Sequence, residues 1–176
     1  LQKGEAINAE NLVLSADTIV VCEGEVLGKP TKDNEAREML RRMRGKSHSV
    51  FTALALRQKS TGLLLQDVCH TQVLMRSYSD VEIESYIQSG AYRDKAGGYA
   101  IQHKAFHPVA AVQGCYANAM GLPPCNLACL LQHAGIAAEV DIPQACQQHL
   151  GITCEVYPQI LASCMPVSQA NRWDSR

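Results

Sequence analysis

Residues 11–21 read Asn-Leu-Val-Leu-Ser-Ala-Asp-Thr-Ile-Val-Val, two apolar and largely β-branched runs on either side of a polar group. Such a pattern predicts a buried strand that is interrupted, or that ends, near Asp17. After it, Glu23-Gly24-Glu25 predicts a tight turn and Val26-Leu27 a short return strand. The stretch therefore predicts the start of a β-sheet with a carboxylate at a break in its first long strand.

Outward from this hairpin, helical and strand periodicities alternate along the chain. Thr31 is expected to cap a helix that Gly45 ends, and Ser79 with Glu82 forms a capping box that opens a second helix. The further strands are expected at residues 50–56, 63–75 and 109–112, and the further helices at residues 127–134 and 142–150. Residues 97–102 are expected to form a glycine-opened turn that runs into a short strand. Strands mixed with helices, some of them paired as hairpins, predict an α/β or α+β sheet rather than a doubly wound parallel one.

The bulk composition narrows the class of protein. A chain of 176 residues is long enough for one compact domain with a real core, expected over residues 1–150 and followed by a C-terminal tail at residues 151–176. A formal net charge of -1 argues against bulk nucleic-acid binding, and the basic strip between Arg37 and Lys46 is expected to be a solvated helix face. No apolar stretch approaches the ~20 residues that cross a bilayer, so no membrane partner is expected.

The eight cysteines contain no C-x-x-C pair. They are expected to be free, buried and packed as small apolar side chains, which favours a reducing, cytoplasmic location. A zinc site built from Cys146, His149 and Cys154 is a further alternative, although the spacing is poor for a closed structural site.

Two blocks hold most of the reactive side chains. The first joins Asp17 and Thr18 to Gly28-Lys29-Pro30, and the second runs from Asp94-Lys95 to Gln102. Two acids, two lysines, an amide and several glycines suit a metal-bound polyphosphate. Carboxylates hold the cation, lysines neutralise phosphate oxygens, and glycines let the backbone approach the phosphates closely. None of these residues is specific alone, since each also fits an ordinary turn or surface position.

In combination the blocks resemble the Maf family of nucleoside triphosphate pyrophosphatases. They keep the family's order and approximate spacing from about Leu12 to Leu131. The matching pieces are Ser15-Ala16-Asp17-Thr18, Gly28-Lys29-Pro30, Gly45-x-x-His48-x-Val50-x-Thr52, the block from Asp94 to Gln102, and Gly114-Cys115-Tyr116-Ala117-Asn118 running into Gly121-Leu122-Pro123. The resemblance implies an α/β fold of the Maf/inosine-triphosphatase-like type, in which helices flank a mixed β-sheet that has a cleft for a nucleotide.

The resemblance also implies a reaction. It is the hydrolysis of the α–β phosphoanhydride of a nucleoside triphosphate, which gives the nucleoside monophosphate and pyrophosphate with Mg²⁺ or Mn²⁺. Asp17 would match the acid that holds the metal and activates water, with Asp94 as a further acid on the metal side. Lys29 and Lys95 would match the lysines that bind phosphate. Cations and metal-held carboxylates are what polyphosphate chemistry needs.

Thr18 and Gln102 narrow the implied substrate. They resemble the branch of the family that acts on dTTP and UTP, whereas the sister branch acts on 7-methyl-GTP. A glutamine amide can pair with the O4 and N3–H edge of a pyrimidine, which agrees with this assignment. The resemblance also implies a cytoplasmic homodimer that removes unwanted nucleotides from the cellular pool.

One departure from the family affects the expected activity. Members open with a Ser-x-Ser-Pro-Arg-Arg segment that supplies phosphate-binding arginines, and nothing in this sequence resembles it. The chain is therefore expected to be an N-terminally truncated or divergent member. The alternative functions are a catalytically weak or inactive Maf-like protein that binds nucleotides or other proteins and, from the cysteines alone, a metal-binding domain.

Overall fold

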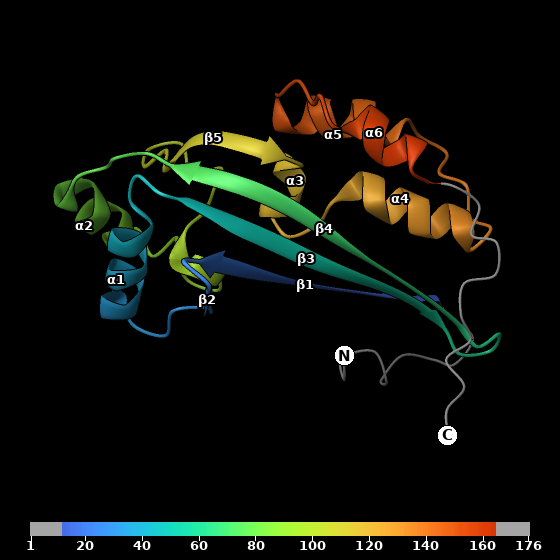
Figure 1. Ribbon diagram of the computed structural model, residues 1–176, viewed down its shortest axis with the longest axis horizontal. Helices are drawn as coiled ribbons and strands as arrows, with labels where there is room; N and C mark the ends of the chain where they lie inside the picture. Colours follow the sequence, from blue (N-terminus) through green and yellow to red (C-terminus); the bar gives the residue numbers. More distant parts are fainter. Residues whose placement is uncertain (1–11, 165–176) are drawn as a thin grey trace.

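The computed structural model describes residues 12–164, and Figure 1 shows a single sheet with helices packed around it. The strands are β1 (Leu12–Cys22), β2 (Glu25–Leu27), β3 (Ser47–Gln58), β4 (Leu63–Met75) and β5 (Val109–Gly114). They lie in the order β2-β1-β3-β4-β5, and every pairing among these strands is antiparallel. The predicted α/β class, a sheet flanked by helices, is confirmed, with antiparallel pairs throughout the described part of the sheet.

The helices gather in two groups. The first, α1 (Asp33–Met43) and α2 (Asp80–Gln88), lies together at one end of the sheet, and the short 3₁₀ helix η2 (Ala96–Gly98) contacts α1 and β1. The second group packs beside β3 and β4 and consists of α3 (Tyr116–Ala119), α4 (Pro124–His133), α5 (Ile142–Leu150) and α6 (Tyr157–Ala162). Across residues 12–164, none of these helices combines the length and the apolar character that a membrane crossing requires.

Strand β1 runs through the polar group without a break, so the predicted interruption near Asp17 is wrong. Its pairing with β3 continues on both sides, with Asp17 opposite Ala53 and Thr18 opposite Thr52. The Asp17 side chain is exposed, so a carboxylate at this position costs the strand no buried charge. Periodicity alone cannot distinguish this arrangement from a strand end.

Two other local predictions differ from the structure. Helix α1 has Lys32 at its N-cap rather than Thr31, whose backbone N–H and hydroxyl both donate to Glu35 Oε2. The glycine-opened turn at Gly97 and Gly98 is confirmed by their φ angles of 71° and 68°, but the short strand expected to follow it does not form. The capping box is confirmed, since Ser79 and Glu82 bond reciprocally at the start of α2.

The main core fills the space between the sheet and the first helix group. Its fully buried members include Leu40 and Met43 of α1 and Tyr86 of α2, packed against Val20 and Val73 of the sheet. The basic strip of α1 does more than face solvent. Its arginines form ion pairs with acids of α2, of the β1–β2 turn and of β2, the pairs being Arg37–Glu84, Arg41–Asp80, Arg44–Asp80, Arg42–Glu23 and Arg42–Glu25.

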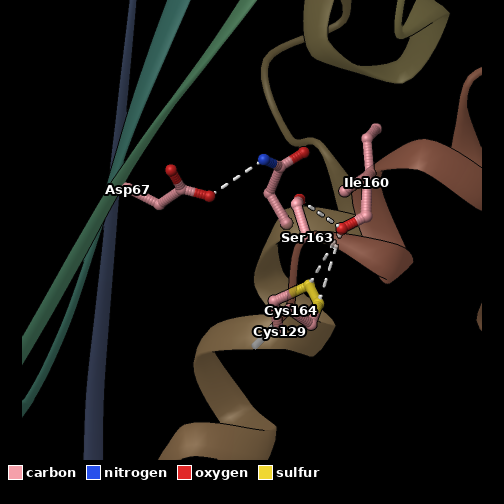
Figure 2. Close-up of a disulfide and its surroundings, with 6 residues drawn as sticks. Asp67, Cys129, Ile160, Ser163 and Cys164 are labelled. Atoms are coloured by element: carbon pink, nitrogen blue, oxygen red, sulfur yellow. Dashed lines mark hydrogen bonds between the residues drawn. A yellow bond between two sulfur atoms is a disulfide. The ribbon is translucent and has the colours of Figure 1, made fainter. Parts of the chain in front are cut away.

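A disulfide links Cys129 of α4 to Cys164, just after α6 (Figure 2). The expectation that all cysteines are free is therefore wrong for these two, while the other six are free thiols. The sequence placed Cys164 in the tail at residues 151–176, but α6 lies in that segment and contacts α4, which brings the two sulfurs together. The boundary between a domain and a tail at residue 150 stays a prediction.

Candidate functional site

A cavity of about 260 Å³ opens beside the middle of β1. Its walls come from β1, from the loop that follows β2, from residues 94–102 and from the end of α3. All six residues that the sequence analysis singled out for chemistry line it. These residues are Asp17, Thr18, Lys29, Asp94, Lys95 and Gln102.

Two glycines of η2 hold the lysine-bearing loops next to each other. The Gly97 N–H donates to the Gly28 carbonyl oxygen at 3.0 Å, which ties η2 to the loop carrying Lys29. A Cβ on Gly97 would lie 3.2 Å from Val20 Cγ1, and a Cβ on Gly98 would lie 3.1 Å from a ring carbon of Pro30. Since both glycines also have positive φ, side chains there would push the loop away from β1 and widen the cavity.

The charges that line the cavity are not neutralised by one another. Asp17, Lys29 and Asp94 are exposed, and no salt bridge to any of them, or to Lys95, occurs within residues 12–164. Among residues 12–164, the Lys95 ammonium group donates only to the Arg93 carbonyl oxygen, at 3.4 Å. Unpaired charges of both signs in one cavity suit a ligand that itself combines a cation with an anion.

The donor set fits a hard divalent cation shared with a phosphate ligand. Asp17 and Asp94 supply carboxylate oxygens, the ligands that Mg²⁺ and Mn²⁺ prefer. Among the described residues no group of three or more His, Cys, Asp or Glu side chains could hold a metal, so these two acids cannot enclose one alone. Magnesium commonly keeps waters and takes phosphate oxygens beside one or two carboxylates, which is the arrangement this cavity could accept.

The predicted alternative of a zinc site finds no support among residues 12–164. Cys146, His149 and Cys154 form no metal-binding group in the part of the chain that the structure describes. Cys146 instead packs against a small apolar cluster around Cys69 and Cys115. The thiol pKa of Cys69 is raised chiefly by its hydrogen bond to Cys115, and burial raises it further.

A buried polar chain supports the wall of the cavity behind Thr18. Thr18 Oγ1 lies 2.8 Å from Thr52 Oγ1, and the Thr52 hydroxyl donates to the Asn118 carbonyl oxygen at 3.3 Å. The Asn118 amide nitrogen donates to the Val50 carbonyl oxygen at 3.2 Å and to Thr71 Oγ1 at 2.9 Å. These bonds fix α3 on β3 and β4, and with it residues 119–121, which line the cavity.

Tyr99 lines the cavity next to Ile101 and is held from behind by His48. The Tyr99 hydroxyl lies 2.8 Å from His48 Nε2, and both side chains are buried. Burial lowers the pKa of His48 to about 4, so its ring is neutral at pH 7 and can accept the tyrosine hydrogen. Burial also raises the pKa of Tyr99, which keeps the phenol protonated.

Tyr99 and residues 119–121 line the cavity and Thr52 supports its wall, but none of them was among the predicted site residues. His48 is a buried histidine behind Tyr99, also outside the set of predicted site residues. All of these residues lie in, or directly beside, the blocks that carry the family resemblance. Their positions in those blocks were the available signal, but only the fold shows that they border the same cavity.

The chain resembles one known protein family over most of its length. The family model described as "Maf-like protein" matches residues 1–134. Three curated relatives, each named dTTP/UTP pyrophosphatase, illustrate the similarity. They are 38% identical over 131 residues (Dehalococcoides mccartyi, covering 74% of this chain and 58% of the relative), 43% over 124 residues (Dictyoglomus thermophilum, 70% and 64%) and 46% over 140 residues (Thermomicrobium roseum, 77% and 63%).

These relatives are longer than this chain. This chain spans roughly three-fifths of the length of these relatives, from 58% to 64%. The dTTP/UTP pyrophosphatase activity in their names is that of those longer proteins. What carries over directly is the family itself, because its model covers well over half of this chain.

Proposed function

Because the chain belongs to the Maf family, we propose that it hydrolyses nucleoside triphosphates of the dTTP and UTP class to the nucleoside monophosphate and pyrophosphate. In the cell this reaction would remove unwanted nucleotides from the pool. The observation that carries the proposal is that Asp17, Lys29, Asp94 and Lys95 line one cavity and make no salt bridge within residues 12–164. Four unpaired charges there favour a metal-bound polyphosphate over an uncharged ligand.

The proposed reaction breaks the bond between the α phosphorus and the oxygen that bridges it to the β phosphorus. Asp17 orients a water molecule and accepts its proton while the oxygen attacks the α phosphorus. Lys29 and Lys95 neutralise the phosphate oxygens, so that the charge on the departing pyrophosphate is stabilised. Both lysines lie on loops whose backbones are joined by the Gly97 N–H to Gly28 carbonyl bond, which brings both ammonium groups to the same cavity.

A divalent cation, Mg²⁺ or Mn²⁺, completes the proposed site. Asp17 and Asp94 would hold it together with phosphate oxygens and water. When bound, it would polarise the phosphoryl group and lower the pKa of a coordinated water.

The proposed preference for dTTP and UTP rests on Thr18 and Gln102. Both line the cavity, and Gln102 is exposed there without a hydrogen bond to any residue of the described chain. Its amide is therefore free to pair with a base, which supports but does not by itself select a pyrimidine. The names of the relatives point to the same class of substrate.

A cytoplasmic location and a homodimer are part of the proposal. Six free cysteines support a reducing compartment, although the Cys129–Cys164 disulfide does not. The homodimer is expected from the family alone. Analytical ultracentrifugation of the purified protein at micromolar concentration measures it directly.

Pyrophosphate release tests the proposed activity. We expect turnover of dTTP and UTP with Mg²⁺, slower turnover of CTP and little of 7-methyl-GTP. Asp17→Asn should lower kcat by about 100-fold or more, because a positioned acid–base group contributes at least that much. Glu139→Gln is the matched control, since this exposed acid lies between α4 and α5 and does not line the cavity.

The outcomes separate the candidate functions. Nucleotide binding without turnover in the unmodified protein would replace the enzyme with a nucleotide-binding member of the family. Equal activity of Asp17→Asn and Glu139→Gln would remove Asp17 from the mechanism. If 7-methyl-GTP were the best substrate, the roles given to Thr18 and Gln102 would be wrong.

A further inference from the structure

Behind Thr18, a series of hydrogen bonds runs from the Thr18 hydroxyl through the Thr52 hydroxyl to the Asn118 carbonyl oxygen. That carbonyl oxygen determines which hydroxyl donates to which. Thr52 is fully buried, and its hydroxyl lies 3.3 Å from the Asn118 carbonyl oxygen and 2.8 Å from Thr18 Oγ1. A hydroxyl has one hydrogen to donate, whereas a carbonyl oxygen can only accept. If Thr52 turned its hydrogen toward Thr18, its lone pairs would face that carbonyl oxygen across 3.3 Å, which is repulsive.

The direction of these hydrogen bonds therefore determines whether the Thr18 hydroxyl can donate to a ligand or only accept from it. Thr52 donates to Asn118, so it accepts from Thr18, and the Thr18 hydrogen points away from the cavity. Only the lone pairs of Thr18 Oγ1 remain for a ligand. Gly121 borders the same oxygen and leaves space there, since even a Cβ on it would come no closer than 3.7 Å.

An acceptor at this point favours one part of a nucleotide. Phosphate oxygens carry negative charge and offer no hydrogen at neutral pH, so they are repelled by a hydroxyl that presents lone pairs. The imide N3–H of uracil and thymine does offer a hydrogen. Cytosine has an unprotonated nitrogen at the same place and would face Thr18 acceptor to acceptor.

We propose that Thr52 is a positioning residue that locks Thr18 as a hydrogen-bond acceptor for the N3–H of uracil or thymine, so that cytosine nucleotides are rejected. The inference rests on the proposed function only in assuming that the cavity takes a nucleotide. Gln102 cannot supply this discrimination. Its amide is exposed and unbonded within residues 12–164, so it can flip and pair with either base.

Binding of nucleotides that cannot be hydrolysed tests the inference separately from catalysis. Isothermal titration with Mg²⁺ compares the α,β-imido analogues of UTP, CTP and 3-methyl-UTP on the full chain. We expect the UTP analogue to bind about tenfold more tightly than either of the others, since both leave Thr18 without its hydrogen bond. The 3-methyl analogue makes this comparison without any change to the protein.

Two variants test the role of Thr52. Thr52→Val keeps the shape of the side chain but frees the Thr18 hydroxyl to rotate, so the preference for the UTP over the CTP analogue should fall about tenfold. Thr52→Ser retains the hydroxyl and should retain the preference. A residue with a purely structural role would weaken both affinities equally and leave their ratio unchanged.

The results distinguish this inference from the proposed function. An unchanged ratio in Thr52→Val, or equal binding of UTP and 3-methyl-UTP analogues by the unmodified protein, overturns the inference and leaves hydrolysis untouched. Absence of hydrolysis together with the expected binding ratios overturns the proposed activity and leaves the inference standing. Binding of none of the analogues overturns both.

Discussion

The contribution of Lys29 to catalysis can be measured against that of Lys59, an exposed lysine far from the cavity lining. Lys29 lines the cavity, is exposed, and has no ion pair within the described residues. Lys29→Ala should lower kcat/KM for UTP by about 10- to 100-fold, because a hydrogen bond to a charged group contributes about 1.5–3 kcal/mol. Steady-state pyrophosphate release measures this. Lys59→Ala, in the exposed turn between β3 and β4, is the control, and equal effects of the two variants would contradict the role.

The burial of His48 makes the stability of the fold depend on pH. Its pKa is lowered to about 4 in the folded protein, against an ordinary value of 6.5. Between these values the unfolded chain binds a proton that the folded chain does not, so stability is complete above pH 6.5 and falls as the pH drops toward 4. The expected loss from this group is about 2–3 kcal/mol between pH 7 and pH 4.5.

Urea unfolding at several pH values measures that loss. His48→Gln removes the titrating ring but leaves a polar side chain that can reach Tyr99, so its stability should change less over the same interval. The difference between the two pH profiles isolates the contribution of His48 from that of the carboxyl groups. Parallel profiles would show that the ring is not held neutral by burial.

At the level of single residues, the sequence was sufficient to predict the charged residues of the site but not the buried polar residues that support it. Asp17 and Lys95 could be predicted as site candidates because their residue types define the chemistry. Thr52 and Asn118 could not, since threonine and asparagine have many ordinary positions and their value here depends on contacts 34 and 66 residues apart in sequence. Such contacts exist only once β1, β3 and α3 are packed.

The capping box of α2 is a prediction at the level of an element. The Ser79 hydroxyl accepts from the Glu82 N–H, while the Glu82 carboxylate accepts from the Ser79 N–H at 2.7 Å. Ser79→Ala should lower the free energy of unfolding by about 1 kcal/mol, because the helix loses the partner of one of its free N–H groups. Thermal or urea unfolding measures this. Ser85→Ala, on the exposed face of the same helix, should have little effect, and similar losses in both variants would exclude a capping contribution.

Elements with a local chemical signature were the predictable ones. The Ser79–Glu82 pair and the alternation along β4 specify their structures within a few residues. The end of the 97–102 segment was mistaken for a short strand because Tyr99, Ala100 and Ile101 have strand-like composition. Their conformation is instead imposed from outside, since Gly97 packs on β1 and the Ala100 N–H donates to the hydroxyl of Tyr86.

At the level of the whole molecule, the fold class followed from the hairpins and the helical periods, whereas the placement of the C-terminal helices did not. Cys129 and Cys164 are 35 residues apart, and no spacing rule pairs them. Their proximity depends on α6 lying against α4, which is a tertiary contact between two short helices. The contact of β4 with α4 depends on the same packing, since Asn126 of α4 donates to the carboxylate of Asp67 at 2.9 Å (Figure 2).

The disulfide should stabilise the attachment of the C-terminal helices to the rest of the fold. A crosslink that closes a loop of this length lowers the entropy of the unfolded chain, worth about 3–4 kcal/mol in the chain-entropy model. Urea unfolding should therefore show Cys164→Ser to be less stable by roughly that amount, and Cys154→Ser, which alters a free thiol, to be nearly unaffected. Thiol titration of the denatured protein should count six groups before reduction and eight after it. Eight reactive thiols before reduction, with equal stabilities of the two variants, would mean that α6 is held on α4 by packing alone.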